Sequence, residues 1–330
     1  MSRGLGDVYK RQVIYIKDKG IVVNQPSVVA YEAKSKKIIA VGNKAKKMLG
    51  KTPEDIEVTR PIRNGVISDY IMTERMLKIY VKSAIAKRKI WGKPNICVCV
   101  PSGVTDVQRR AACDAVYRTG AKNVYVLEEP FAAAIGAGVD IESAVGAMVV
   151  DIGAGTTDIA IVARGGVQHS SSIKIGGDDF DEAIIRYMRK RHNVLLGESS
   201  AEQLKKDIGS VYPREQDAIG YARGKELVRG LPTKMAVKSS EMIEACQEET
   251  DQILDSVRDM LEAAPPELVS DISEHGIILA GGGSKIFGMD KLIMDKIGVP
   301  VVNIKNPDQV VATGAGTAHY YIKDGRTLEE

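Results

Sequence analysis

Residues 149–162 read VVDIGAGTTDIAIV, in which two apolar runs flank a short loop of small residues that carries an aspartate at each end. Apolar runs of this length that are rich in β-branched residues are typical of buried strands. Glycine and small hydroxyl residues leave backbone N–H groups accessible to an oxyanion, so this composition at a strand end favours phosphate binding. An ordinary glycine-rich hairpin is the alternative on these residues alone.

The loop offers specific groups to a phosphate. Gly153 and Gly155 allow the backbone to close on phosphate oxygens, and Thr156 and Thr157 would add hydroxyl donors. Asp151, at the end of the preceding strand, is a candidate for holding a hydrated Mg²⁺, because this ion prefers oxygen ligands and keeps several waters.

Two common nucleotide-binding motifs do not fit this chain. A dinucleotide fingerprint would need glycine at position 158, where Asp158 stands, and a helix where the apolar run 159–162 predicts a strand. The only Gly-Lys-Thr sequence, at residues 50–52, would need glycine at position 45 to form a P-loop, and Ala45 is there. Neither motif is therefore expected to bind the phosphate.

Composition limits the class of protein. The chain has 330 residues, of which 44% are hydrophobic and 27% charged, enough for one large or two medium domains. Its formal net charge of +3 is too balanced for recruitment by bulk charge, so we expect no nucleic-acid partner. The four cysteines form no CxxC pair, so zinc and disulfides are not expected. No signal peptide or apolar run of about 18 residues is found, which predicts a cytoplasmic protein.

Apolar runs of strand length alternate with segments of helical periodicity, which predicts an α/β fold. Helices are expected at residues 74–89, before Gly92 and Pro94, and after Ser240, ending before Pro265. Strands are expected in the runs QVIYIK, SVVAYE, KKIIAVG, NICVCVP, NVYVLEE, AMVVDIG, TDIAIVAR and GIILAGG.

Two parts of the chain have the same expected order of strands, turns and helices. The segments VIYIKDKGIVV and TDIAIVARGGVQHS each read as two strands joined by a turn that contains glycine. Each is later followed by a strand, a small-residue loop and a helix. An internal duplication with a ligand cleft between the halves would explain this similarity. The similarity alone does not establish a duplication.

Three further segments carry groups suited to a nucleotide site. Residues 281–285, GGGSK, follow the strand GIILA, and their glycines would allow close backbone approach to a flat ligand. Glu202 and Lys205 lie one helical turn apart, where a solvated ion pair is the alternative. Glu128 and Glu129 end an apolar strand and precede a helix. Carboxylates there could orient water for attack on phosphorus, or could stabilise the helix N-terminus instead.

These motifs stand in the order and spacing of the actin, DnaK-type chaperone and sugar-kinase superfamily. The segments that carry this likeness are LEEPFAAAIGAG, DIGAGTTD, IKIGGDDFDEAI, AEQLKKDIG and ILAGGGSKIFGMDKL. From about residue 13 to residue 321 the chain closely resembles the MreB-like family of bacterial actins, including RPIRNGVISDY, VCVPSGVTDVQRRA, GYARGKELVRGLPTK and LEAAPPELVSDISEHGIILAGGG. So many ordered motifs make the resemblance highly specific.

The resemblance implies an actin-like α/β fold, in which two duplicated domains, each with a smaller subdomain, surround an ATP cleft. It places the first domain at residues 13–136 and 305–330, with its subdomain at about 24–64. The second domain would be 137–304, with its subdomain at about 180–240. The implied chemistry is a slow ATPase, ATP to ADP and phosphate, coupled to polymerisation in a primarily structural protein.

The resemblance also implies roles for individual residues. Glu129 matches the residue that activates water, and Asp151 would hold Mg²⁺ through water. Glu202 and Lys205 match the ribose and adenine contacts. The implied nucleotide-binding residues are Asp151, Gly153, Ala154, Gly155, Thr156, Thr157, Gly176, Gly177, Glu202, Lys205, Gly281, Gly282, Gly283, Ser284 and Lys285.

Partners and location follow from the same resemblance. A member of this family would assemble with itself into filaments on the inner face of the cell membrane. There it would work with cell-wall synthesis and shape-determining membrane proteins to direct rod shape. The loop that enters the bilayer in this family corresponds to Ile90 and Trp91, beside the basic Lys87, Arg88 and Lys89. An indole folded back onto its domain is the alternative.

The amino-terminal segment departs from the family. The family's first phosphate loop, of the type Asp-Leu-Gly-Thr-Ala-Asn, aligns with residues 6–11, which read GDVYKR. Residues 1–12 therefore form an anomalous segment that lacks this loop. We hypothesise that the segment is foreign to the family, a junction in place of the family's own start. Genuine divergence with impaired nucleotide binding is the alternative.

A second departure keeps another function open. The segment IGGDDFDEAI is closer to the chaperone version of this motif than to the usual bacterial-actin version. A DnaK-type chaperone-like ATPase without a substrate-binding domain is therefore the alternative. A sugar kinase would need a sugar pocket with a catalytic aspartate, for which no motif matches.

Overall fold

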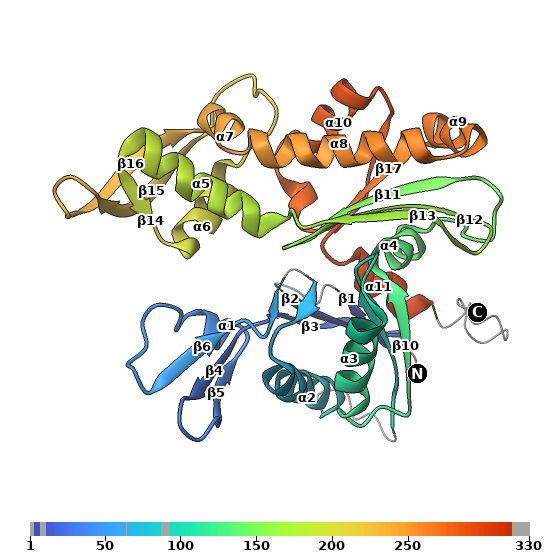
Figure 1. The fold of residues 1–330 in the computed structure, drawn as a ribbon, viewed down its shortest axis with the longest axis horizontal. Coiled ribbons are helices and arrows are strands. Elements are labelled where there is room, and N and C mark those ends of the chain that lie inside the picture. The colour runs from blue at the N-terminus through green and yellow to red at the C-terminus, as the bar shows by residue number, and fades with distance from the viewer. Residues whose placement is uncertain (1–2, 7–10, 64, 87–92, 319–330) are drawn as a thin grey trace.

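The chain folds into two lobes, each built on a five-stranded sheet, which lie one above the other in Figure 1. The structure is a computed structural model that describes residues 3–6, 11–63, 65–86 and 93–318. No helix in this part of the chain is long and apolar enough to cross a membrane.

The two five-stranded sheets share one topology. Their strand orders are β10-β9-β1-β2-β3 and β13-β12-β11-β17-β18. In each sheet, three consecutive strands pair antiparallel, and two later strands add in parallel beside the first of the three. This repeated order confirms the expected duplicated α/β fold. The strands are β1 Arg3–Gly6, β2 Arg11–Ile16, β3 Gly20–Pro26, β9 Asn95–Val100, β10 Asn123–Glu128, β11 Ala147–Ile152, β12 Thr157–Ala163, β13 Gly166–Ile173, β17 Ile277–Ala280 and β18 Val301–Asn303.

Helices α2 (Tyr70–Ala86) and α3 (Asp106–Tyr117) cover the outer face of the first sheet (Figure 1). The apolar face of α2 is buried against strand residues such as Ile14 and Ile16. The helix begins four residues before the start expected from the sequence. Helix α3 begins with a capping box, because Thr105 and Gln108 each accept a hydrogen bond from the other's backbone N–H.

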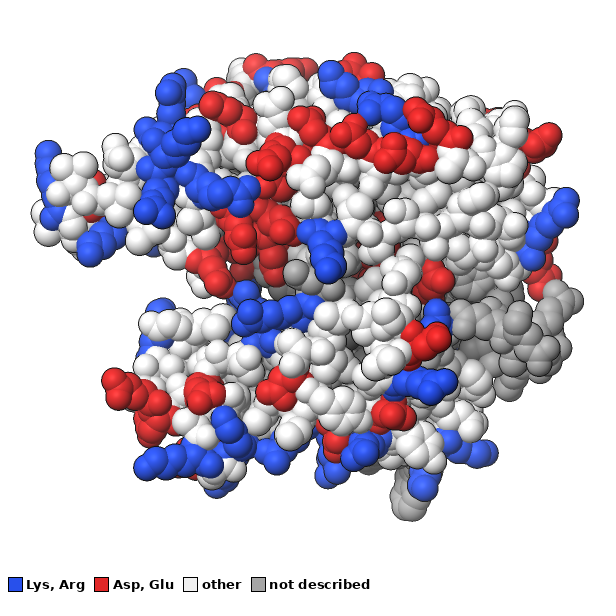
Figure 2. All heavy atoms as spheres, viewed as in Figure 1, with Lys and Arg blue, Asp and Glu red and all other residues white. Residues whose placement is uncertain are grey.

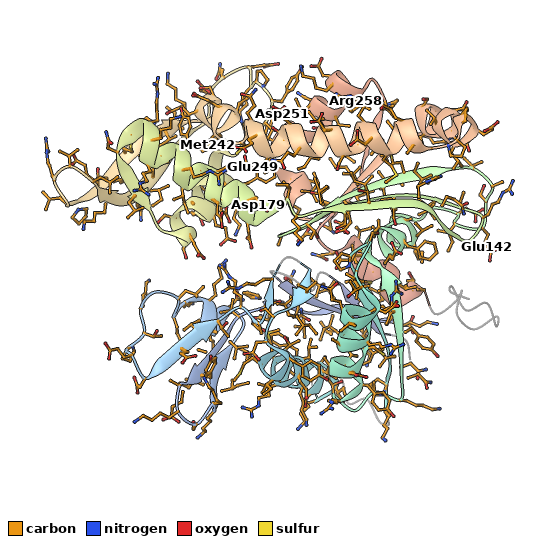
Figure 3. All side chains as sticks on the ribbon, viewed as in Figure 1. Glu142, Asp179, Met242, Glu249, Asp251 and Arg258 are labelled. Carbon is orange, nitrogen blue, oxygen red and sulfur yellow. The ribbon has the colours of Figure 1, made fainter. Side chains whose placement is uncertain are left out.

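The outer face of the second sheet is covered by α8 (Gln247–Ala263), α9 (Pro266–His275) and α10 (Met289–Ile297) (Figure 1). The single helix expected after Ser240 is in fact two helices, because α7 (Ser239–Ala245) ends at Cys246 before α8 begins. The predicted stop before Pro265 is confirmed. Met242 of α7, labelled in Figure 3, belongs to the buried core of this lobe.

Helices α4 (Glu129–Ala137) and α11 (Val310–Thr317) lie between the two sheets. Helix α4 packs on β11 and β12 of the second sheet, whereas α11 packs on β1, β2 and β9 of the first. Their apolar residues share one buried core with residues from both sheets, including Cys99 and Val149. The two lobes are therefore joined through this helix pair.

Each lobe carries a smaller sheet at the same side of the molecule (Figure 1). The first lobe has β5-β4-β6, with β4 Val29–Glu32, β5 Ile38–Val41, β6 Ile56–Thr59 and the short helix α1 Asn43–Lys46. The second has β14-β15-β16, with β14 Val194–Leu196, β15 Ile219–Glu226 and β16 Pro232–Lys238, next to α5 Gly177–His192 and α6 Glu198–Ile208. A two-stranded pair, β7 Ile62–Arg63 and β8 Val66–Ile67, follows β6. The exact domain boundaries implied by the resemblance stay predictions.

The pairing of α4 with α11 depends on glycine. A Cβ atom added to Gly314 would lie 1.7 Å from the Ala132 carbonyl oxygen, and one added to Gly136 would lie 2.1 Å from the Val310 carbonyl oxygen. No side chain fits in either place unless the helices separate.

We therefore expect Gly314→Ala to lower the free energy of unfolding by about 3 kcal/mol, at the upper end of the usual cost of overpacking. Gly166→Ala is the matched control, because its added Cβ would have nothing within 4 Å and its φ is not positive. Urea unfolding followed by circular dichroism measures both. Equal stabilities of the two variants would show that α4 and α11 can separate without cost.

Candidate functional site

The loop between β11 and β12 forms a tight hairpin turn. Ile152 and Thr157 are paired across the hairpin, and the Gly153 N–H donates to the Thr156 carbonyl oxygen at 2.9 Å. Asp151 is 4% exposed at the end of β11. The predicted strand, small-residue loop and strand are therefore confirmed.

The two threonine hydroxyls of this loop donate hydrogen bonds to the protein. The Thr156 hydroxyl donates to Asp158 at 2.8 Å, and the Thr157 hydroxyl donates to the Ile175 carbonyl oxygen at 2.8 Å. In this structure their oxygens are left to act as acceptors. The donors that the loop offers to an anion are then its backbone N–H groups.

The first turn of α5 rests on the same loop. The N–H groups of Gly177 and Asp178 donate to the carbonyl oxygens of Gly153 and Ala154 at 3.0 and 2.7 Å. A Cβ atom on Gly176 would lie 2.6 Å from the Ala154 carbonyl carbon, so this approach requires glycine. The positive end of the helix dipole is thereby brought to the loop, where it favours an anion.

Asp179 lies in the first turn of α5, at the end of the helix that meets this loop (Figure 3). Its carboxylate accepts the Gly176 N–H at 2.7 Å. Burial raises the pKa of Asp179, and the hydrogen bond from Gly176 opposes that rise. The carboxylate therefore fixes the backbone just before the helix begins.

The second glycine loop touches the first. Gly281 has φ +82°, and a Cβ atom there would lie 2.2 Å from the Ile152 carbonyl oxygen and 2.4 Å from Asp151 Oδ1. Ser284, in the short 3₁₀ turn η1 (Gly283–Lys285), donates to the Gly281 carbonyl oxygen at 2.7 Å. The two loops, more than a hundred residues apart in the chain, therefore lie against each other.

Glu202 and Lys205 both reach the cleft from α6, but each is paired with other residues. Lys205 Nζ lies 2.7 Å from Asp181 Oδ1 and also donates to the Gly177 carbonyl oxygen. Glu202 pairs with Lys206 at 2.7 Å and with Lys46 of the first lobe at 2.5 Å. The alternative of an isolated surface pair does not describe them.

A cleft of about 550 Å³ is lined by eight of the fifteen residues predicted to bind nucleotide. Both glycine loops and α6 contribute to its wall, and Lys285 at its edge pairs with Asp308. The predicted residues that line it are Gly153, Ala154, Gly177, Glu202, Lys205, Gly282, Gly283 and Lys285. A volume of this size is typical of small-ligand sites.

Glu129 lies beside this cleft. It is 3% exposed at the N-terminus of α4 and shares a small cavity with Asp151, Gly153 and Gly281. Gly153 also lines the large cleft, so the two spaces adjoin. The carboxylate predicted to act on water is therefore next to the loop predicted to hold phosphate.

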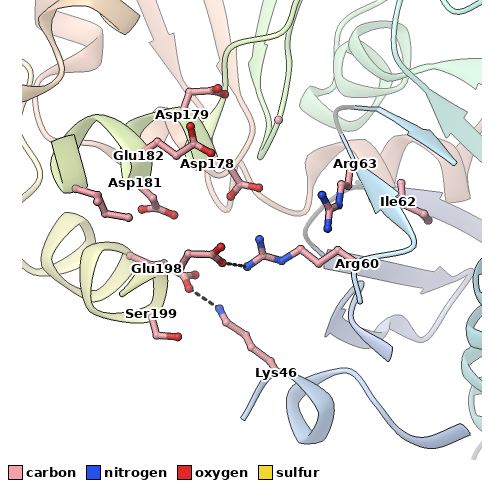
Figure 4. A pocket seen from close by; sticks show the side chains of 13 residues that line it. Lys46, Arg60, Ile62, Arg63, Asp178, Asp179, Asp181, Glu182, Glu198 and Ser199 are labelled. Atoms are coloured by element: carbon pink, nitrogen blue, oxygen red, sulfur yellow. Dashed lines mark hydrogen bonds and ion pairs between the residues drawn. The ribbon is translucent and has the colours of Figure 1, made fainter. Parts of the chain in front are cut away.

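An adjoining cavity of about 370 Å³ runs between the small sheets of the two lobes. Figure 2 shows acidic residues of the upper lobe facing basic residues of the lower lobe across this groove. Two ion pairs cross it, Arg60 to Glu198 at 2.9 Å and Lys46 to Glu202 at 2.5 Å (Figure 4). Opposite charges therefore bridge the two lobes at the mouth of the cleft.

Sequence reasoning missed several residues of this site. Lys46 and Arg60 come from the small sheet of the first lobe, and Arg214 in the cleft lies 3.8 Å over the Phe287 ring. No local pattern marks these residues, because their partners are distant in the chain.

Some predicted residues cannot be placed. Ile90 and Trp91 lie outside the described residues, as do residues 7–10 of the segment that aligns with the first phosphate loop. Within the described ranges, no group of three or more His, Cys, Asp or Glu side chains could hold a metal ion. The role of Asp151 in holding a hydrated Mg²⁺ stays a prediction, and such an ion needs only one or two protein carboxylates when phosphates supply other ligands.

Comparison with known proteins gives the same family from sequence and from fold. The family model described as MreB/Mbl protein matches residues 5–327. The cell shape-determining protein MreB of Escherichia coli K12 is 46% identical over 310 residues, which cover 93% of this chain and 89% of that protein. The crystal structure of MreB5 of Spiroplasma citri bound to ADP superimposes with a TM-score of 0.91 at 34% identity, covering 98% of this chain and 97% of the other.

A more distant structure supports the fold alone. The MamK double helical filament superimposes with a TM-score of 0.80 at 22% identity, over 97% of this chain and 98% of that one. The two lobes with their central cleft therefore have the actin-like fold.

Proposed function

The chain belongs to the MreB/Mbl protein family, and we propose that it is an ATP-dependent, filament-forming cytoskeletal protein. The observation that carries this proposal is the convergence of two glycine loops, the α5 N-terminus and Glu129 around two adjoining cavities. The relative MreB5 was crystallised with ADP, and MamK forms a double helical filament. The family match over residues 5–327 favours this function over the DnaK-type alternative.

In this proposal the triphosphate lies on the β11–β12 loop. The backbone N–H groups of residues 154–156 would face its charge, and the N-terminus of α5 would add a favourable helix dipole. Asp151 would hold Mg²⁺ through water, and this ion would supply positive charge next to the phosphates. The ribose and base lie toward Glu202, Lys205 and residues 281–285.

Glu129 orients the attacking water. Its carboxylate is buried at the start of α4, close to Gly153 and Asp151. A carboxylate that accepts a hydrogen bond from water points the oxygen lone pair at phosphorus and takes the proton that the water loses.

Hydrolysis is coupled to assembly through the relation between the lobes. Glu202 lines the nucleotide cleft and also pairs with Lys46 of the opposite lobe. Conversion of ATP to ADP beside this carboxylate would therefore alter the contact between the small sheets. Subunits of a filament must have surfaces that fit one another. The relative position of the two lobes changes those surfaces, so it would favour or oppose polymerisation.

We also propose that the filaments lie on the inner face of the cell membrane and direct cell-wall synthesis and rod shape. The curated relative is named as a cell shape-determining protein, which supports a role in shape. For the membrane contact, the sequence places the apolar Ile90 and Trp91 directly after the basic residues 87–89, a combination suited to an anionic interface.

Glu129→Ala should lower the rate of ATP hydrolysis by about 10²–10⁴-fold while changing ATP affinity little, because the group acts mainly in the transition state. Phosphate release and calorimetric titration measure the two quantities, and ATP-dependent sedimentation measures assembly. Glu142→Ala removes an exposed carboxylate far from the cleft and serves as the control (Figure 3). Unchanged turnover with weaker ATP binding would assign Glu129 to binding instead.

Replacing residues 6–11 with Asp-Leu-Gly-Thr-Ala-Asn should tighten ATP binding by about tenfold or more. One charge-assisted hydrogen bond regained at the phosphates contributes about 1.5–3 kcal/mol. A second variant with a Gly-Ser linker at the same positions separates this gain from the mere loss of the present side chains. Equal ATP dissociation constants for all three proteins would refute a phosphate-binding role for this segment.

The fluorescence of Trp91, the sole tryptophan, should shift to the blue when anionic vesicles are added, because the ring would leave water for the interface. Vesicle co-sedimentation should be lost in the Ile90→Ser, Trp91→Ser double variant. It should persist in Val228→Ser, which removes an apolar side chain that is 78% exposed elsewhere. Emission that is already blue-shifted in buffer and insensitive to lipid would place the ring in the protein core.

A further inference from the structure

Arg214 and Phe287 form a flat contact in the wall of the cleft that has no role in the function proposed above. The central carbon of the Arg214 guanidinium lies 3.8 Å over the centre of the Phe287 ring. Both residues line the cleft of about 550 Å³, and both are half-buried. This distance is van der Waals contact for planar groups, so the guanidinium lies face to face with the ring.

Backbone contacts join the two segments that carry this pair. The Val211 N–H donates to the Phe287 carbonyl oxygen at 3.0 Å, and Ser210 and Phe287 form a parallel β-bridge. Arg214 Nη2 donates to the Gly209 carbonyl oxygen at 3.3 Å, just after the end of α6. The position of the guanidinium is therefore set by the same helix that carries two of the predicted nucleotide contacts.

The ring of Phe287 is the main partner of the guanidinium. Arg214 Nε is buried and donates no hydrogen bond to any atom of the described residues. The cost of that buried donor is offset by the cation–π contact with the ring. Because Phe287 covers one face of the guanidinium, the face left for the cleft is the opposite one.

This pair lies at the end of the cleft where the base is proposed to bind. Phe287 follows the turn η1, residues 283–285, by two residues, and the proposed function places the base beside that turn. Among the described residues that line the cleft, Phe287 is the only aromatic one and Arg214 the only arginine. They therefore offer the largest planar side-chain surface that a flat base would meet there.

The chemistry of this surface favours a large ring system. A guanidinium stacks on the face of an aromatic or heteroaromatic ring, and a larger ring makes more contact. Adenine and guanine have two fused rings, whereas cytosine and uracil have one. One guanidinium nitrogen donates to Gly209 and another is buried, so the surface would contact the face of a base rather than its edge.

We propose that Arg214, supported by Phe287, stacks on the base of the bound nucleotide and makes the cleft selective for purine over pyrimidine nucleotides. Arg214 supplies the stacking plane, and Phe287 is a positioning residue that holds this plane. Contacts with ribose and phosphate are shared by all ribonucleotides, so they cannot supply this selectivity. The inference rests on the proposed nucleotide site.

The test measures the dissociation constants of ADP and CDP for the purified chain by calorimetric titration. The wild type should bind ADP more tightly than CDP. Arg214→Ala should weaken ADP binding about 5- to 20-fold, the usual effect of losing one stacking contact, and CDP binding only about twofold. The preference for the purine nucleotide should therefore fall, which a merely structural role of Arg214 would not cause.

Two further variants separate stacking from charge. Arg214→Lys keeps the positive charge and loses the plane, so it should lose the purine preference as Arg214→Ala does. Phe287→Leu keeps an apolar side chain and loses the ring, so it should cause a smaller loss of the same kind. Combined with Arg214→Ala, it should weaken ADP binding little further, because both changes remove one contact.

Arg223→Ala is the matched control. Arg223 is an exposed arginine on β15, in the same lobe, and it lines neither the cleft nor the adjoining cavity. Its ADP and CDP dissociation constants should equal those of the wild type.

Several results would overturn the inference. Equal weakening of ADP and CDP binding in Arg214→Ala would make the residue a charge contact for the phosphates, and a full purine preference in Arg214→Lys would show that the plane is not needed. If Arg214→Ala does not fold, Arg214→Lys decides alone. A wild-type chain that binds ADP and CDP equally would overturn the inference and leave the nucleotide site intact, whereas a chain that binds neither would also overturn the proposed function.

Discussion

Close contact between the backbones of α4 and α11 is the constraint on which the rest of the structure depends. Gly136 and Gly314 leave no room for a side chain, so the two helices fit between the two sheets and join the lobes through one core. Because Glu129 begins α4, this packing also sets where its carboxylate lies relative to Asp151 and the phosphate loop. The inner part of the cleft is therefore formed by closely packed backbone, so its shape can change little.

The mouth of the cleft is held differently. Lys46 and Arg60 of the first lobe pair with Glu202 and Glu198 of the second, and all four side chains keep some contact with solvent. Ion pairs of this kind contribute little stability and can break and re-form. A rigid joint at the centre with a weaker contact at the edge suits a protein whose lobes would move when the nucleotide changes. Glu202, which belongs to the cleft and to the contact, links the two.

The sequence predicted the parts of this fold that depend on local pattern. Each run expected to be a strand contains one, and the β11–β12 turn lies where glycine and threonine follow an apolar run. What it could not predict are contacts between distant segments, such as Lys46 with Glu202 and Ser102 with Asp158. The break at Cys246 was also missed, because the apolar stripe continues across it. Periodicity reports which face is buried, not which residue of another lobe lies against it.

We propose that one nucleotide lies between the lobes with its phosphates on the β11–β12 loop. A crystal structure of the purified chain with Mg²⁺ and a non-hydrolysable ATP analogue tests it most directly. We predict the base beside residues 281–285, the phosphates on residues 153–157 and the terminal phosphate nearest Glu129. An analogue bound outside the cleft, or one with its triphosphate directed away from Glu129, would contradict the account.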